Sequence, residues 1–282
     1  MLTLMRTTAP SRPHSTPVSR PVHCFRKRIS KSRASLYDQT AGRSVLKRIG
    51  ILLKIEPTIP EVYVALKQLL DERRATSAKN APPARSAAFQ RGVDQLIADG
   101  IAQNTVKEGD IAPDFQLPDA RGNQVSLYER LSRGAVVLTF YRGGWCPYCN
   151  LQLRAYQAIL PELQTLDTSL IAISPERPDD SLSTIEKNEL DFDVLSDING
   201  DAGRAYRVTF ELSDELKAVY TEIGNDLAKR NADGEWHLPL PATYVIAPDK
   251  RVTFAFVDAD YRNRLEPTDI VTAVRTLATT LA

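Results

Sequence analysis

The feature that most constrains this chain is a pair of cysteines, three residues apart, at the expected start of a helix. Residues 135–141 form a nearly continuous apolar run, which is typical of a strand buried in the centre of a sheet. The run ends at two glycines, and Cys146 and Cys149 follow shortly after them. Apolar residues then recur at helical spacing over 151–160. The order strand, turn, cysteine pair, helix predicts a right-handed β-α-β unit with two thiols on the first helical turn.

The spacing of the two cysteines favours redox chemistry over a structural role. A disulfide between residues i and i+3 closes a very small ring, which barely restricts the unfolded chain and therefore adds little stability. The positive end of the helix dipole favours thiolate over thiol. Pro147 suits the first helical turn, where its missing N–H would have no partner anyway. We therefore expect Cys146 and Cys149 to form a reversible disulfide.

Two other interpretations of the cysteine pair remain open, and we favour neither. A zinc site would need more ligands, but the third cysteine, Cys24, lies in a polar N-terminal stretch and is interpreted as an incidental thiol. The three histidines are His14, His23 and His237. Two inert buried cysteines at this spacing would be a coincidence next to the shaped Gly-Gly-Trp turn. We expect no metal and no bound organic cofactor.

Composition indicates a soluble globular protein. The 282 residues are 43% hydrophobic and 25% charged, and the net charge of +1 gives no reason to expect nucleic acid or an anionic membrane as partner. No apolar run approaches the roughly 20 residues of a membrane helix. Three cysteines are too few for a secreted disulfide scaffold, so a reducing compartment fits best. We predict a cytoplasmic protein.

The N-terminal segment, residues 1–48, is predicted to be a disordered basic tail or a targeting segment. Residues 1–37 contain eight Lys or Arg and no Asp or Glu. Such a composition also fits a transit peptide, which would place the protein in a mitochondrion or plastid, but the four prolines oppose an amphipathic helix. We favour the solvated tail.

Two domains are predicted after the tail. Residues 49–108 are expected to be a helical N-terminal extension, with helices over 60–74 and 84–102. The remaining domain, residues 109–282, should mix strands and helices. Its expected strands, besides 135–141, are 115–117, 125–127, 169–174, 193–195, 243–246 and 252–257. Its expected further helices are 181–190, 214–223 and one that starts at Glu266.

The motif around the cysteines resembles several families of the thioredoxin superfamily. Trp145-Cys146-x-x-Cys149 is similar to thioredoxin, and Cys-Pro-Tyr-Cys is similar to glutaredoxin. Residues 112–115, Ala-Pro-Asp-Phe, and the Phe-Tyr strand end resemble peroxiredoxins of the alkyl hydroperoxide reductase and thiol-specific antioxidant type. The resemblance spans about 109–280. It implies an α/β, thioredoxin-like fold: a central mixed sheet flanked by helices, with a peroxiredoxin-type N-terminal strand extension and two preceding helices.

The resemblance to peroxiredoxins departs at several positions. Peroxiredoxins carry Pro-x-x-x-Thr-x-x-Cys, and Cys149 matches the cysteine that attacks peroxide. Arg142 stands at the proline, Cys146 at the threonine whose hydroxyl orients the peroxide, and Gln152 at a frequent glutamate.

A second departure lies at Pro241. Peroxiredoxins place an activating arginine two residues before a Thr-Phe-x-Ile strand, which corresponds here to Thr243–Ile246. Pro241 occupies that position, and it resembles instead the cis-proline that faces the cysteine pair in thioredoxin-like oxidoreductases. Loss of the hydroxyl and the arginine would cost about 100-fold or more in rate. Fast peroxide reduction is therefore less expected than thiol–disulfide exchange.

We thus predict a peroxiredoxin-like thiol oxidoreductase in which Cys146, the more exposed cysteine, attacks a substrate disulfide and Cys149 resolves the mixed disulfide. In the alternative, a thioredoxin-dependent peroxidase, Cys149 attacks peroxide and Cys146 resolves the sulfenic acid. A further alternative is a non-catalytic binding protein of the same fold. The supporting site residues are expected to be Trp145, Pro147, Tyr148 and Pro241.

The expected partners follow from the same resemblance. They are a thioredoxin-type or glutathione-type reductant and a protein disulfide or a peroxide, and the chain is expected to be a monomer or homodimer. Polar residues follow the last strand: Asp258, Tyr261, Arg262 and Arg264. One interpretation places them in a loop near the site, and we favour a solvated connection to the final helix.

Overall fold

The computed structural model describes residues 65–281 of the chain. The predicted tail over 1–48 lies outside the described residues, so its division from the extension stays a prediction. The helices are α1 (Leu66–Asn80), α2 (Pro83–Ala98), α3 (Leu127–Leu131), α4 (Pro147–Thr165), α5 (Pro178–Asn188), α6 (Asp201–Ala205), α7 (Asp214–Glu222), α8 (Leu227–Arg230) and α9 (Pro267–Leu281), with a 3₁₀ turn at Ile101–Asn104. The strands are β1 (Gln116–Pro118), β2 (Gln124–Ser126), β3 (Ala135–Phe140), β4 (Thr168–Ser174), β5 (Asp193–Ser196), β6 (Thr209–Glu211), β7 (His237–Pro239), β8 (Ala242–Ile246) and β9 (Val252–Val257).

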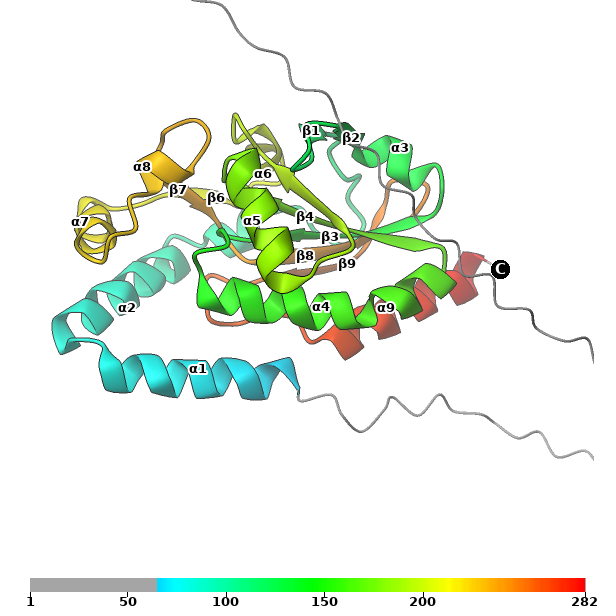
Figure 1. Ribbon diagram of the computed structural model, residues 1–282. Coiled ribbons are helices and arrows are strands. Elements are labelled where there is room, and N and C mark those ends of the chain that lie inside the picture. Colours follow the sequence, from blue (N-terminus) through cyan, green and yellow to red (C-terminus); the bar gives the residue numbers. More distant parts are fainter. Residues whose placement is uncertain (1–64, 282) are drawn as a thin grey trace, which may run out of the picture. The chain divides into compact units, whose positions relative to one another are not determined.

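A five-stranded mixed sheet forms the centre, in the order β5-β4-β3-β8-β9 (Figure 1). Strands β3, β4 and β5 run parallel, whereas β8 pairs antiparallel with both β3 and β9. The connection from β3 through α4 to β4 is the predicted β-α-β unit. A separate antiparallel hairpin, β1 with β2, supplies the predicted N-terminal strand extension. This arrangement confirms the thioredoxin-like fold class.

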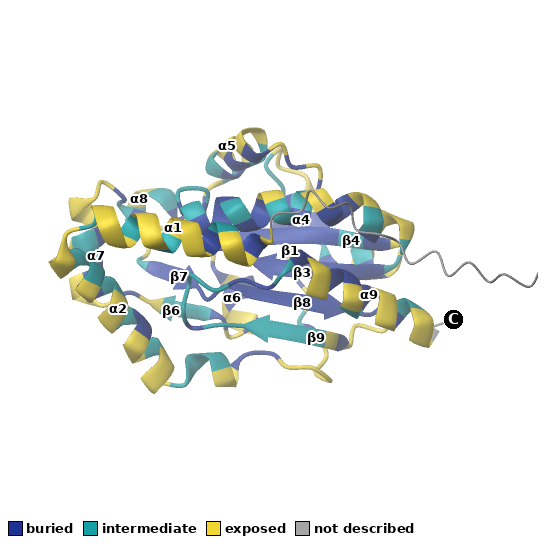
Figure 2. Cartoon of the chain, turned by 90° about the horizontal axis from the view of Figure 1, so that it is seen from below, coloured by how far each residue is buried: buried dark blue, intermediate teal, exposed yellow. Residues whose placement is uncertain are grey.

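Strand β3 separates two apolar cores, because every residue in it is buried and successive side chains point to opposite faces. Val136, Leu138 and Phe140 contact one cluster, to which α3 and α6 contribute. Val137 belongs to the other cluster, which contains α1, α4 and α9 and both cysteines of the pair. Figure 2 shows the buried sheet between helices whose outer faces are exposed. The cysteine pair therefore lies on the α4 side of the sheet.

Helix α1 packs directly on the α4 face. Leu66 and Leu70 are buried in the same cluster as Cys149. Glu266, just before α9, accepts a hydrogen bond from the backbone N–H of Leu66 at 3.1 Å and so satisfies a free donor at the start of α1. The helix expected over 60–74 lies partly outside the described residues, and the observed α1 extends beyond it to Asn80.

Helix α2 packs against α7. The Phe89 ring meets the Tyr220 ring edge-on, with centroids 5.3 Å apart. A Cβ atom at Gly92 would lie 2.7 Å from Leu216 Cδ1, so this glycine lets the two helices approach closely. The extension thus places side chains beside both α4 and α7.

Several short elements were missing from the sequence prediction: α3, α6, α8, β6 and β7 each have three to five residues. Segments this short display at most a weak hydrophobic period, so tertiary contacts contribute much of what fixes their structure. Among residues 65–281, no helix combines the length and the apolar character needed to cross a membrane.

Candidate active site

Two glycines shape the turn that delivers the cysteine pair to the start of α4. Gly143 has φ +142°, and a Cβ atom there would lie 2.4 Å from Trp145 Nε1. A Cβ atom at Gly144 would lie 2.0 Å from Thr184 Oγ1. Neither position accommodates a larger residue without displacing its neighbours. Cys146 is the N-cap of α4, which begins at Pro147, so Cys149 lies in the first helical turn.

Both cysteines are free thiols, and both are buried, with exposed fractions of 1% for Cys146 and 0% for Cys149. Cys146 is the more exposed of the two, as expected, but the difference is small because the first turn of α4 packs under α1 and the aromatic side chains around it. Only Cys146 of the two lines the adjacent pocket. Cys149 lies deeper, inside the apolar cluster below α4.

An arginine contacts the deeper sulfur. The Nη2 of Arg264 lies 3.4 Å from Cys149 Sγ, and its Nε donates to Gln152 Oε1 at 2.7 Å. Gln152 in turn donates to Thr139 Oγ1 at 3.0 Å. Arg264 is only 7% exposed. The interpretation of residues 258–264 as a solvated connection is therefore wrong, because the loop folds back over the sheet and inserts this guanidinium beside the thiol.

A second arginine, Arg142, lies on the pocket side of the cysteine pair. Its guanidinium carbon is 4.3 Å from the centroid of the Tyr261 ring and 5.2 Å from that of Trp145. It also donates to the Tyr220 hydroxyl. This side chain is 4% exposed. Aromatic rings are favourable neighbours for a cation that is withdrawn from water.

The two arginines change the expected electrostatics of the site. The activating arginine was judged missing because Pro241 stands at its position in the sequence. Arg264 reaches the same thiol from the loop between β9 and α9 instead. The arginine is absent from position 241 as inferred, but a guanidinium from another part of the chain contacts the same sulfur.

The environment assigns different protonation states to the two cysteines. Burial alone would raise the pKa of Cys149, but the hydrogen bond from the Cys146 thiol and the positive charge of Arg264 outweigh it and hold that pKa well below its ordinary value. Burial and the neighbouring Cys149 sulfur raise the pKa of Cys146 well above its ordinary value. The surroundings thus favour ionisation of Cys149 over ionisation of Cys146.

A buried carboxyl, Glu176, lies beneath the glycine turn. It is 1% exposed and accepts a hydrogen bond from the backbone N–H of Gly144 at 2.7 Å. Burial raises the pKa of Glu176 to about 7, against the opposing effect of that hydrogen bond. The side chain follows β4 and was not identified from the sequence, because nothing in Ser-Pro-Glu at 174–176 shows that tertiary packing buries it.

The raised pKa of Glu176 predicts a pH-dependent stability. The carboxyl has an ordinary pKa of 4.5 and a folded-state pKa of about 7. Below pH 4.5 the carboxyl is protonated in both the folded and the unfolded state. Between pH 4.5 and about 7 the unfolded state has lost the proton while the folded state still holds it, so the wild-type protein loses stability relative to Glu176→Gln as the pH rises. We expect a difference of about 3 kcal/mol between the two limits. Denaturant unfolding of reduced protein at several pH values measures it. Parallel pH curves for the two proteins would contradict the assignment, and exposed Glu222→Gln is the control.

The predicted supporting residues fall into two groups. Trp145, Pro147 and Tyr148 line the same pocket as Cys146. Pro241 does not line it, and no cis peptide bond occurs within residues 65–281, so the expectation of a thioredoxin-type cis-proline is wrong. Pro241 is a buried residue ahead of β8, and its carbonyl accepts from the Asp258 N–H at 3.2 Å.

Comparison with known proteins identifies the family. The model of the AhpC/TSA family matches residues 109–255, just over half of the chain. The chain belongs to the AhpC/TSA family. The matched segment of this AhpC/TSA protein contains the cysteine pair, Arg142 and Glu176, whereas Arg264 lies beyond its end.

The AhpC/TSA protein is similar to curated peroxiredoxins over part of their length. It is 35% identical over 94 residues to peroxiredoxin Bcp of Escherichia coli K12, covering 33% of this chain and 60% of Bcp. It is 36% identical over 89 residues to a putative peroxiredoxin of Mycobacterium tuberculosis, covering 32% and 56%. The crystal structure of peroxidoxin BcpB from M. tuberculosis is 23% identical with a TM-score of 0.49, covering 61% of this chain and 98% of that chain.

Three side chains of this AhpC/TSA site were not assigned to it in the sequence prediction: Arg142, Glu176 and Arg264. Arg142 was visible only as a substitution at a family position, and Arg264 only as one of four polar residues after the last strand. Neither pattern indicates which arginine reaches the sulfur.

Proposed function

We propose that this chain is a thiol peroxidase in which Cys149 attacks the peroxide and Cys146 resolves the product. The observation that carries the proposal is the contact of Arg264 Nη2 with Cys149 Sγ at 3.4 Å. A guanidinium at this distance stabilises the thiolate, which is the nucleophilic form. The sequence also aligns Cys149, not Cys146, with the attacking cysteine of peroxiredoxins. The sequence position and the neighbouring charge therefore both indicate Cys149 as the attacking sulfur.

The proposed chemistry balances without a cofactor. The Cys149 thiolate attacks the terminal oxygen of a hydroperoxide; an S–O bond forms, the O–O bond breaks, and the departing alkoxide takes up a proton. The Cys146 thiol, having lost its proton, then attacks the sulfur of the Cys149 sulfenic acid, so that a disulfide forms and water leaves. Two external thiols restore the dithiol and become a disulfide.

Two kinds of similarity support this proposal. The chain belongs to the AhpC/TSA family, and the curated relatives carry the name peroxiredoxin. The chain covers only 60% of the length of E. coli Bcp, so activity, substrate and partners are proposals for the whole protein. A thioredoxin-type reductant and a peroxide substrate accord with the family. The cytoplasmic location and the monomeric or homodimeric state stay predictions.

Thiol–disulfide exchange is the second candidate function, because Cys146 is the cysteine that lines the pocket. In that reaction Cys146 would attack a substrate disulfide and Cys149 would resolve the mixed disulfide. The geometry opposes it, since the guanidinium of Arg264 contacts the Cys149 sulfur and so favours Cys149 as the nucleophile.

A direct comparison of oxidants tests the proposal. Reduced protein is mixed with hydrogen peroxide or with glutathione disulfide at equal concentration. The change in tryptophan fluorescence measures the rate of disulfide formation beside Trp145. We expect hydrogen peroxide to react at least about tenfold faster than glutathione disulfide, because the guanidinium beside the Cys149 thiolate also stabilises the negative charge that develops on the departing oxygen. The reverse order of rates would favour exchange and exclude the peroxidase assignment. Protein with both cysteines replaced by Ser is the control for direct fluorescence effects.

A further inference from the structure

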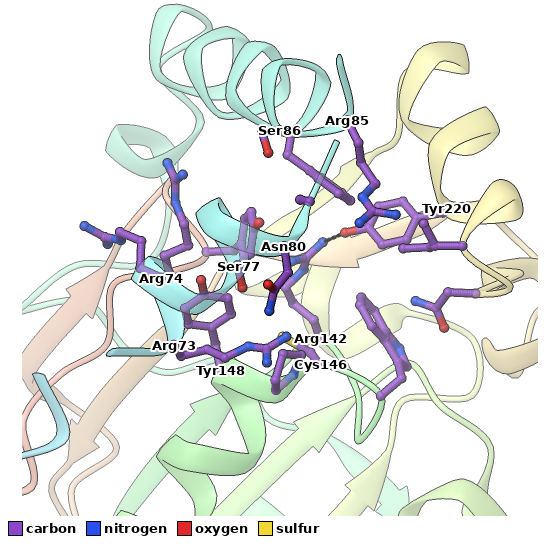
Figure 3. Close-up of a pocket in the computed structure, with 18 of the residues that line it drawn as sticks. Arg73, Arg74, Ser77, Asn80, Arg85, Ser86, Arg142, Cys146, Tyr148 and Tyr220 are labelled. Carbon is purple, nitrogen blue, oxygen red and sulfur yellow. Dashed lines mark hydrogen bonds between the residues drawn. The ribbon is translucent and has the colours of Figure 1, made fainter. Parts of the chain in front are cut away.

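A pocket of about 560 Å³ opens beside Cys146. Side chains from α1 and α2 face those of the turn before α4 across it, as Figure 3 shows. The end of α7 and the loop before α9 close the remaining sides. This volume is typical of a small-molecule site. Because α1 and α2 precede the segment matched by the family, part of this pocket is built by residues outside the AhpC/TSA match.

The charge on the pocket wall has one sign. Six arginines line it and no Asp, Glu or Lys does: the arginines are Arg73, Arg74, Arg85, Arg142, Arg230 and Arg262. Of these six arginines, only Arg262 forms an ion pair with a residue in 65–281, to Asp260 at 2.6 Å. Converging positive charges in the wall of a cleft raise the local concentration of anions.

Buried donors on the same wall lack partners. Arg142 Nε, Arg74 Nε and Trp145 Nε1 are inaccessible to solvent and have no hydrogen-bond acceptor among the described residues. One acceptor on the wall, Asn225 Oδ1, is also without a donor. Unpaired buried donors are costly, and these atoms lie behind the surface of the cavity. The guanidinium groups that line the cavity suit a ligand with several acceptor oxygens, and carboxylates match this requirement.

The position of the cysteines indicates which half of the reaction uses the pocket. Only Cys146 of the pair lines it, while Cys149 lies deeper beside Arg264. A thiol arriving from the pocket therefore reaches Cys146 of the disulfide and expels Cys149. Exchange is fastest when the leaving sulfur is the better-stabilised thiolate, and Arg264 stabilises that of Cys149.

We propose that the arginine-lined pocket binds the carboxylates of a small acidic thiol, the reductant that reopens the Cys146–Cys149 disulfide. The inference rests on the proposed function only because it requires that the Cys146–Cys149 disulfide forms. The proposed reductant differs from a protein of the thioredoxin type, because it is a small molecule that carries more than one negative charge.

The reduction balances in two steps. The thiolate of the first molecule attacks Cys146 Sγ; an S–S bond to Cys146 forms, the disulfide breaks, and Cys149 leaves as a thiolate. The thiolate of a second molecule attacks the ligand sulfur of this mixed disulfide, releasing Cys146, which takes up a proton. The two small thiols are oxidised to their disulfide, and the protein gains two electrons.

Glutathione, a thiol with two carboxylates, is the probe. The full chain is oxidised with diamide, so that the result does not depend on reactivity with peroxide. Reduction by glutathione is compared with reduction by its diethyl ester and by 2-mercaptoethanol. We expect glutathione to show saturation and to react about tenfold faster than the ester, with an advantage that shrinks at high salt. Equal, unsaturable rates for glutathione and the ester would overturn the proposal.

Variants separate charge recognition from general damage. Arg73→Gln with Arg85→Gln should lower reduction by glutathione about tenfold and change reduction by 2-mercaptoethanol less than about twofold. The matched control is Lys79→Gln, which removes one exposed charge from α1 outside the pocket. An equal loss with both thiols would contradict anion recognition.

The pocket could instead hold the carboxylate of an acidic hydroperoxide. Oxidation of reduced protein by linoleic acid hydroperoxide is therefore compared with oxidation by its methyl ester. We expect similar rates for the two. A strong preference for the free acid, without any preference for glutathione, would assign the pocket to the oxidant and overturn the proposal.

Discussion

Cys149→Ser is expected to lower the rate of reaction with hydrogen peroxide by more than about 1000-fold. The serine hydroxyl cannot form an anion at neutral pH, whereas the Cys149 sulfur is held as a thiolate by Arg264 and by the Cys146 thiol. Cys146→Ser should keep the first oxidation within about tenfold, because the serine hydroxyl also donates a hydrogen bond. The rates are measured by stopped-flow fluorescence with peroxide in excess.

Mass spectrometry of the products distinguishes the two roles. Wild-type protein should lose two hydrogens, as a disulfide forms. Cys146→Ser should gain one oxygen, because the sulfenic acid on Cys149 then has no neighbouring thiol to condense with. If Cys149→Ser reacts rapidly and Cys146→Ser does not, the roles are reversed and the exchange mechanism first expected from the sequence is correct.

Arg264→Met should reduce the peroxide reaction at neutral pH by about 100-fold. The substitution removes the charge next to Cys149 Sγ and leaves a side chain of similar length. The pKa of Cys149 should rise, so the pH above which the reaction reaches its full rate should move upward. The rate is measured as a function of pH for both proteins.

Several controls separate this electrostatic effect from misfolding. Arg264 also donates to Gln152 and to the carbonyl of Asn263 at 2.6 Å, so its loss could loosen the loop. Circular dichroism and thermal unfolding test for that. Arg264→Lys, which keeps a charge, should recover part of the rate at the same pH. Exposed Arg121→Gln is the surface control. An unchanged pH profile in Arg264→Met would refute a role in thiolate stabilisation.

Local patterns in the sequence were enough to predict most of the fold. The apolar run at 135–141, the hairpin around 248–250 and the helix after Glu266 all have lengths at which periodicity is visible, and each is present. The cysteine spacing likewise indicated the start of α4, because two thiols and a proline at a helix N-terminus form a local motif. Five short elements, α3, α6, α8, β6 and β7, gave no such signal, although the equally short strands β1, β2 and β5 were predicted.

The electrostatics of the site depend on contacts that no local pattern encodes. Arg264 is 115 residues from Cys149 along the chain, yet it provides the nearest guanidinium. Comparison with the peroxiredoxin pattern suggested that an arginine is lost, because Pro241 stands at its position. Such a comparison shows which residue occupies a position, but not which point in space a long side chain from another position reaches. A flexible guanidinium can reach one point from several elements of a fold.

The sequence by itself therefore determined that this chain carries a pair of thiols at the start of a helix on a thioredoxin-like sheet, since both features depend on neighbours in the sequence and on hydrophobic period. Only the tertiary structure decided which of the two sulfurs lies beside a guanidinium and which kind of ligand the neighbouring pocket favours. Those properties come from desolvation and from charges brought together by packing. Coulomb energy depends on distance in space and on burial, and neither is a function of separation along the chain.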